Sequence, residues 1–206
     1  MARPTLSAEE VELFRRDLCD VALRRFAEDG FASVTIRGLA DELGCSHGRP
    51  YRYFTNKQDI FDTVRAHAYD RFAAALDLAA VNEPDPLERL RLMMAAYMRF
   101  AIDEPYAYRI MFELDQPTGE NVPIDQLAKR LRAWDVWQGE IRNAIEAGRL
   151  EGSPSVAAHV FWAGVHGLVA LHLAGKLALG ENLSALSTPL IEAMLRAYGA
   201  RTSEAP

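Results

Sequence analysis

Residues 35–57 of this chain, from Thr35 to Lys57, read TIRGLADELGCSHGRPYRYFTNK. Two short helical patterns lie on either side of Gly44 in this segment, and its second half is basic and aromatic. From Ser46 to Lys57 it contains three cations and no acid. A compact helix-turn-helix that carries arginine, tyrosine and lysine without carboxylates is suited to enter a DNA groove. We therefore predict that this segment is a DNA-reading element.

The sequence upstream of this segment predicts the helices that support it. Apolar residues recur every three or four positions from Leu13 to Phe26, which indicates a helix with one apolar face, ending at Gly30. Thr35 is expected to cap a second helix, which stops at Gly44. Together with a third helix after the turn, these segments would form a three-helix DNA-binding domain.

The remainder of the chain also shows helix signals, with strand signals nearly absent, and we expect about nine helices in all. Ser153-Pro154 and Thr188-Pro189 each pair an N-cap residue with a proline in the first turn of a helix. They predict two long final helices, roughly 154–176 and 189–199. The first of these is almost continuously apolar, but it lacks flanking basic clusters and an aromatic belt. We therefore expect a core or interface helix and no membrane span.

Composition limits the class of protein further. The net charge of −6 argues against a protein that coats nucleic acid without regard to sequence. Cys19 and Cys45 are the only cysteines, and their positions do not favour a disulfide, which fits a reducing cytoplasm. Neither cysteine nor histidine clusters at metal-ligand spacing, so we expect no metal and no cofactor.

The predicted third helix would present its first turn to the base edges, while neighbouring side chains hold the phosphates. Ser46 is expected to cap this helix, and Arg49 has the chemistry to pair with a guanine edge. Phe54 is expected to be a core anchor. The candidate DNA-contacting residues are Thr35, Arg37, Ser46, His47, Gly48, Arg49, Tyr51, Arg52, Tyr53 and Lys57.

The pattern over roughly residues 10–61 resembles the N-terminal domain of tetracycline-repressor-type (TetR family) regulators. It is carried by Ala22-Leu23, Gly30-Phe31, Thr35-Ile36, Leu39-Ala40, Leu43-Gly44, Ser46, Gly48, Tyr51, Phe54 and Lys57. Trp162 to Gly167 resembles the Trp-His-Gly signature of one class of C-terminal domains in that family. The resemblance places the family's DNA contacts at Thr35, Ser46, Gly48, Tyr51, Tyr53 and Lys57.

The resemblance implies an all-α fold, with an N-terminal helix-turn-helix domain and a C-terminal helical domain for ligand binding and dimerisation. We assign residues 1–56 to the first domain, 57–201 to the second and 202–206 to a disordered tail. The resemblance also implies a homodimer and a small effector. Pairing of the last two helices with their copies would set two reading heads about one DNA turn apart, hence a palindromic operator.

Pro50 departs from the family pattern, which usually has an aliphatic residue there. Proline has no amide to bond the Ser46 carbonyl, and it disfavours helical geometry at Arg49. The recognition helix is therefore expected either to start late, near Pro50, or to be distorted in its first turn.

Large side chains of the predicted C-terminal domain, most of them apolar, are candidates for an effector cavity, although their spacing alone favours core packing. They are Tyr97, Phe100, Met111, Phe112, Trp134, Trp137, Trp162 and His166. Together they indicate an apolar or aromatic effector. We predict a ligand-responsive repressor that binds double-stranded operator DNA. The alternatives are an activator, a regulator with a protein partner, or an all-helical enzyme that uses His159 or His166 as a base. No nucleophile, carboxylate pair or phosphate loop stands near these histidines in sequence.

Overall fold

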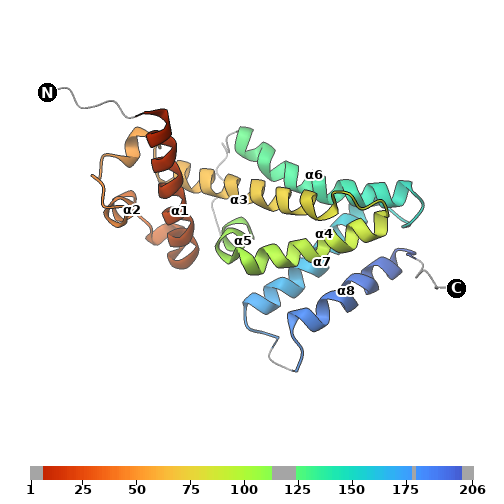
Figure 1. The fold of residues 1–206 in the computed structure, drawn as a ribbon. Coiled ribbons are helices and arrows are strands. Elements are labelled where there is room, and N and C mark those ends of the chain that lie inside the picture. The colour runs from red at the N-terminus through yellow and green to blue at the C-terminus, as the bar shows by residue number, and fades with distance from the viewer. Residues whose placement is uncertain (1–6, 113–123, 178–179, 201–206) are drawn as a thin grey trace. The chain divides into compact units, whose positions relative to one another are not determined.

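The computed structural model describes residues 7–112, 124–177 and 180–200, and within these ranges the chain is helical without any strand (Figure 1). The eight α-helices and one 3-10 helix are α1 (Ala8–Ser33), α2 (Ile36–Glu42), η1 (Pro50–Arg52), α3 (Lys57–Ala80), α4 (Pro86–Asp103), α5 (Pro105–Phe112), α6 (Ile124–Glu146), α7 (Pro154–Leu173) and α8 (Leu183–Ala197). The predicted all-α fold is confirmed.

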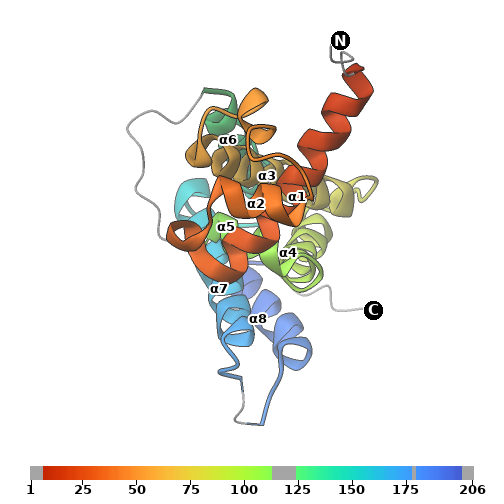
Figure 2. The same cartoon turned by 90° about the vertical axis from the view of Figure 1, so that its left-hand side faces the viewer.

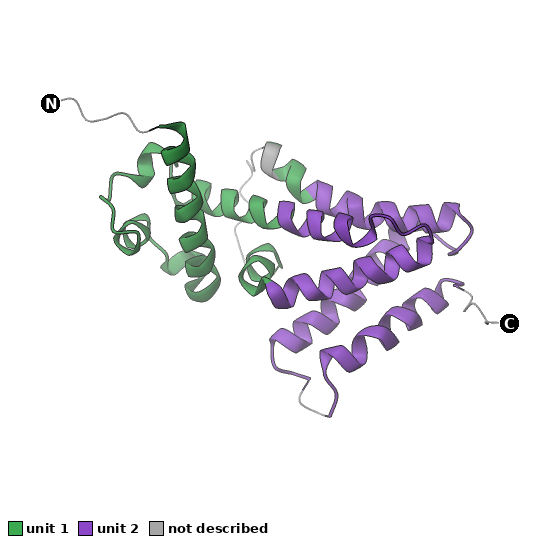
Figure 3. Ribbon diagram, in the orientation of Figure 1, with its two compact units in different colours: residues 1–69, 104–130 green, residues 70–103, 131–206 purple. Residues whose placement is uncertain are grey.

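The helices form two compact units, which Figure 3 shows in different colours. Unit 1 comprises residues 1–69 and 104–130, and unit 2 comprises residues 70–103 and 131–206. Helices α3 and α6 each continue from one unit into the other. The domain boundary between residues 56 and 57 remains a prediction, and the predicted tail at 202–206 lies outside the described residues.

Unit 1 is built on the buried face of α1. A capping box starts the helix, since Glu10 N donates to Ser7 Oγ at 3.1 Å and Ser7 N donates to Glu10 Oε2 at 2.7 Å. Phe14, Leu18 and Phe26 are then buried at helical spacing. Gly30 leaves helical geometry with a φ of 78°, as expected, but the chain resumes one more helical turn to Ser33 instead of ending there.

The start of α2 agrees with the prediction, whereas the helix expected after the turn does not form. Thr35 Oγ1 accepts a hydrogen bond from Gly38 N at 3.0 Å and so caps α2. The prediction of a helix from Ser46 is wrong. The Ser46 carbonyl accepts a hydrogen bond from Arg49 N at 2.8 Å in a tight turn, and only the three-residue η1 follows. Pro50 is the physical reason, because it lacks the amide that an α-helix would need at that position. A helical turn does start late, at Pro50, as one of the two predicted alternatives, but it is a single 3-10 turn and not a recognition helix.

Unit 2 packs α4, α7 and α8 against one another, and α7 and α8 lie side by side in Figures 1 and 2. Close approach is possible at Gly164, because a Cβ there would lie 2.6 Å from Met194 Sδ. By length and composition α7 is apolar enough to cross a membrane. Its buried residues, Ala157, Ala158, Phe161, Val165, Leu168 and Val169, nevertheless belong to the core of unit 2.

The last helix begins earlier than the sequence predicted. Asn182 caps α8, since its Oδ1 accepts from Ala185 N at 3.0 Å, and Pro189 lies inside the helix. A proline in a helix interior costs one backbone hydrogen bond and about 3 kcal/mol. Burial of Leu183 in the first turn and of Ile191 after the proline offsets this cost.

Candidate functional site

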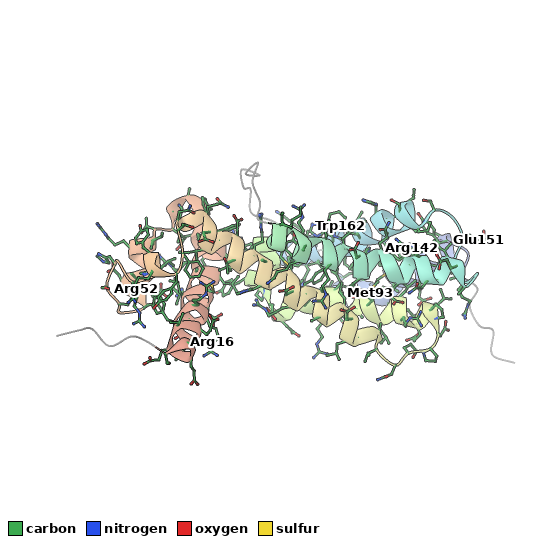
Figure 4. The ribbon with its side chains drawn as sticks, turned by 90° about the horizontal axis from the view of Figure 1, so that it is seen from above. Arg16, Arg52, Met93, Arg142, Glu151 and Trp162 are labelled. Carbon is green, nitrogen blue, oxygen red and sulfur yellow. The ribbon has the colours of Figure 1, made fainter. Side chains whose placement is uncertain are left out.

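Residues 45–54, in the segment between α2 and α3, contain most of the candidate DNA contacts, and we call them the reading turn. Its side chains divide into an exposed group and a group held against α1. Arg52, labelled in Figure 4, is exposed, and Tyr51 is 59% exposed. The full exposed set, including the two candidates at the start of α2, is Thr35, Arg37, Ser46, His47, Gly48, Tyr51 and Arg52.

Phe14 of α1 holds the other group. The Arg49 guanidinium lies 4.1 Å from the centre of the Phe14 ring, and the Tyr53 ring packs on the same ring at 5.3 Å. A cation over an aromatic face contributes about 0.5–2 kcal/mol. Arg15 secures the end of the turn, because its Nη1 donates to the Tyr53 carbonyl at 3.0 Å. The sequence identified Phe14 only as part of an apolar stripe, and nothing local in it signals this role.

Two polar atoms of this held group lack a hydrogen-bond partner among the described residues. They are Arg49 Nε and the Tyr53 hydroxyl, and both are buried. A buried donor without an acceptor costs about 1–3 kcal/mol. The reading turn therefore retains hydrogen-bonding capacity that unit 1 does not use in this conformation. The predicted DNA contacts of both residues remain predictions.

Lys57 and His47 also have partners within unit 1. Lys57 Nζ donates to the carbonyls of Phe31 and Ala32 at 2.7 and 3.3 Å, so it ties the start of α3 to the end of α1. His47 Nε2 lies 2.6 Å from Asp41 Oδ1, at the end of α2. Their DNA contacts are likewise untested predictions.

The exposed cations of this region are available to a polyanion. Neither Arg37 nor Arg52 forms an ion pair with any residue in the described ranges, and both are exposed. A solvated arginine next to a reading turn gains a phosphate partner without first losing a carboxylate. This arrangement concentrates positive charge on one part of a chain that is acidic as a whole.

In unit 2, six of the predicted effector residues lie in one aromatic cluster around Tyr97. Trp162 Nε1 donates to the Tyr97 hydroxyl at 3.2 Å, and that hydroxyl lies 3.1 Å from His166 Nδ1. An indole can only donate, so the Tyr97 oxygen accepts from Trp162 and its proton is free to be donated to His166. Tyr97 and Trp137 are almost fully buried, whereas Trp162, labelled in Figure 4, is half-buried.

Further rings extend the Tyr97 cluster. Phe72 packs edge-on against both Tyr97 and Phe100, at 5.1 and 5.2 Å between ring centres. Trp134 lies 6.0 Å from Trp162. The two remaining candidates, Met111 and Phe112, belong to α5 in unit 1, and their part in an effector site remains a prediction.

A separate groove of about 500 Å³ lies in unit 2 among α4, the end of α7 and the start of α8. Sequence reasoning missed it, because the start of α8 was predicted six residues too late and three distant segments contribute to it. It is lined by Ala95, Met98, Arg99, Ile102, His172, Asn182, Leu183, Ser184 and Ser187. Arg91 of α4 steadies the same pair of helices, since its Nε donates to Glu192 Oε1 of α8 at 2.6 Å. This hydrogen bond raises the pKa of Arg91 and lowers the pKa of Glu192.

Two parts of the chain match known families. Residues 18–64 match the model of bacterial regulatory proteins of the tetR family, and residues 90–198 match the tetracyclin repressor-like C-terminal domain. The chain belongs to the TetR family. It is therefore a DNA-binding transcriptional regulator with a helix-turn-helix and a ligand-binding C-terminal domain. The TetR fold points to a non-enzymatic protein.

The chain is also similar to individual proteins. The nucleoid occlusion factor SlmA of Edwardsiella ictaluri is 31% identical over 154 residues, which cover 70% of this chain and 73% of that protein. A solved structure of a Rhodococcus sp. RHA1 protein of unknown function has a TM-score of 0.78 at 25% identity, covering 89% of this chain and 94% of that one. The fatty acid degradation regulator FadR of Bacillus halodurans shares the fold, with a TM-score of 0.75 at 16% identity over 96% of this chain and 100% of that chain.

Proposed function

We propose that this TetR-family protein is a cytoplasmic repressor, which binds a palindromic operator as a homodimer and is released by a small apolar or aromatic effector. The observation that carries the proposal is the reading turn, where exposed cations without acidic partners adjoin a tightly supported turn. Since the chain carries a net charge of −6, this local surface favours docking at particular sequences over general adhesion to DNA.

The exposed and held residues of the reading turn would have different tasks. Ser46, His47 and Gly48 are proposed to face the bases, because they are small or hydrogen-bonding and are exposed. Arg37 and Arg52 are proposed to bind phosphate, with help from the exposed hydroxyls of Thr35 and Tyr51. Arg49, Tyr53 and Lys57 complete the proposed interface, and their contacts with α1 support its shape.

Unit 2 supports the proposed effector site. The Tyr97 cluster would surround an aromatic or apolar ligand with rings, and its hydroxyl and imidazole would offer one polar end. Trp162 and His166 both reach the Tyr97 hydroxyl. This shared contact supports the proposal that the C-terminal domain belongs to the Trp-His-Gly class.

Exposed apolar side chains on α7 support the proposed homodimer. Val156, Val160 and Leu171 are 57%, 44% and 48% exposed, and they recur at helical spacing on one face. Such a face is suited to pair with its copy around a two-fold axis, which would give two reading heads and a palindromic site.

The test is selection of DNA duplexes from a randomised pool, followed by footprinting of the selected sequence and of the DNA upstream of the gene. We expect a protected palindrome, with an affinity that falls steeply as salt rises. The footprint is then repeated with a panel of apolar and aromatic compounds, and at least one should abolish it. Failure of the wild-type protein to enrich any sequence would sink the repressor proposal.

A second candidate is a DNA-bound factor that works with a protein partner and not at a promoter. The similarity to SlmA, which is named as a nucleoid occlusion factor, favours it. A map of bound sites on the chromosome separates the two: a repressor should occupy a few upstream regions, whereas an occlusion factor should occupy many dispersed sites. An activator would share the upstream sites but raise transcription in a reporter assay.

A further inference from the structure

Helices α1 and α5 of unit 1 are joined by a short hydrogen bond between exposed side chains. The Tyr106 hydroxyl of α5 donates to Glu28 Oε1 of α1 at 2.6 Å. A bond to an ionised carboxylate is stronger than one between neutral groups. It lowers the pKa of Glu28 and raises the pKa of Tyr106, and in each case this bond is the largest cause.

From Glu28 the polar contacts continue to α2. Arg24 Nη1 lies 3.2 Å from Glu28 Oε2, and its other terminal nitrogen, Nη2, donates to Glu42 Oε1 at the end of α2. Arg25 Nε adds a second contact to Glu42, at 3.7 Å. Two neighbouring arginines of α1 thus hold the last residue of α2.

The end of α2 also contacts the reading turn. Asp41 precedes Glu42, and its Oδ1 lies 2.6 Å from His47 Nε2. Adjacent carboxylates therefore connect α2 to α1 on one side and to the reading turn on the other. We call the set Tyr106, Glu28, Arg24, Glu42, Asp41 and His47 the polar path.

The other end of the polar path is covalently close to the candidate effector residues. Only Glu104 separates Asp103, the last residue of α4, from Pro105, the first of α5. Helix α4 carries Tyr97 and Phe100 of the aromatic cluster.

We infer that Tyr106 is a positioning residue for DNA recognition, whose bond to Glu28 fixes α1, and through Arg24 the end of α2 and the reading turn, relative to α5. The inference rests on the proposed function, because it names the contacts that position the same reading turn. Exposed ion pairs add little to stability. The polar path acts by raising the fraction of molecules whose reading turn is in the binding-competent arrangement.

The first test compares Tyr106→Phe, Glu28→Ala and the double variant for binding to the duplex selected with the wild-type protein. We expect each single variant to bind this duplex about 3–10-fold more weakly, and the double variant to be no weaker than Glu28→Ala, because the two residues act through one bond. Affinity for non-specific DNA should stay unchanged. Losses that multiply in the double variant, or equal losses on both kinds of DNA, would overturn the inference.

A matched control removes a comparable exposed contact elsewhere. Asp103→Asn weakens the pair between Arg99 and Asp103, 3.2 Å apart and both exposed, and it should leave operator affinity at the wild-type value. A purely structural role for Tyr106 would instead lower the melting temperature of Tyr106→Phe without changing its discrimination between operator and non-specific DNA.

A second measurement needs no operator, so it decides the inference even if the repressor proposal fails. Amide hydrogen exchange of the free protein should be faster at the end of α2 and in the reading turn of Tyr106→Phe than in the wild type, and unchanged in Asp103→Asn. Equal exchange in Tyr106→Phe and the wild type would refute the inference. The repressor proposal fails separately, if the wild-type protein selects no duplex.

Discussion

The reading turn of unit 1 and the aromatic cluster of unit 2 differ in how far their polar side chains are hydrogen-bonded within the protein. In the reading turn, Arg49 Nε and the Tyr53 hydroxyl are buried without a partner, and the neighbouring cations Arg37 and Arg52 have no acidic partner in the described part of the chain. In the cluster, the Tyr97 hydroxyl has bonds to Trp162 and His166.

This difference indicates how each region can bind. The solvated cations Arg37 and Arg52 favour an anionic partner from outside, and a DNA backbone supplies both acceptors and charge. A cluster whose polar groups already bond one another stabilises unit 2, so a ligand that enters it must replace those bonds or leave them intact. The reading turn should therefore be sensitive in binding assays, and the cluster in stability assays.

The largest expected effect is on the cluster. Trp137→Ala removes a buried ring and the bond from its Nε1 to the Ala158 carbonyl at 2.9 Å, so we expect a loss of about 3–5 kcal/mol in the free energy of unfolding. Urea denaturation measures it. Trp137→Phe keeps most of the apolar volume and should lose far less. A loss under about 1 kcal/mol for the alanine variant would show that the cluster is not part of the stabilising core.

A smaller loss of stability is expected from Tyr97→Phe. The variant keeps the ring but removes the oxygen that Trp162 contacts, and we expect a cost of about 1–3 kcal/mol by urea denaturation. Tyr51→Phe is the matched control in the reading turn, where the hydroxyl is solvated, and it should unfold like the wild type. Similar losses for both tyrosines would erase the contrast between the two regions.

A substitution in the reading turn should change DNA affinity and not stability. Arg52→Ala is expected to weaken binding to all sequences about tenfold and to reduce the salt slope by about one, as for a lost phosphate contact. Unfolding free energy should stay within about 0.5 kcal/mol of the wild type. Arg16→Ala removes an exposed cation of α1 outside the candidate interface (Figure 4) and should leave both unchanged. If Arg52→Ala relaxes preference at one base pair only, Arg52 reads a base and the proposed phosphate contact is wrong.

The smallest expected effect is a difference in thiol reactivity between the two cysteines. Burial raises the pKa of the Cys19 thiol to about 11, so roughly one molecule in a thousand carries the thiolate at pH 8. Cys45 is only half-buried, in the reading turn. A thiol reagent at pH 8 should label one cysteine per folded chain and both in denaturant, and the fast reaction should disappear in Cys45→Ser. Rapid labelling of native Cys19 would indicate that α1 opens readily.

Local signals succeeded where neighbours in sequence decide the structure. Thr35 caps α2 because its side chain needs only an amide three residues away. Pro50 predicted a late start for the helix after the turn, since proline changes the hydrogen bonding of its own backbone. The helix start predicted at Thr188-Pro189 was wrong, because packing overrode this local start signal. Helix α8 begins at Leu183, with Asn182 as its cap.

The sequence by itself determined the all-α class, because helical spacing, caps and proline act over a few residues, and its resemblance to the TetR family indicated the helix-turn-helix. Six of the eight candidate effector residues that it singled out lie in the aromatic cluster of unit 2. The tertiary structure alone decided which atoms of those residues remain available. The Phe14 ring contacts Arg49 and Tyr53, which lie 35 or more positions away in sequence, and Tyr106 bonds to Glu28, 78 positions away. Such contacts depend on how helices pack in space, and no periodicity in the sequence specifies them.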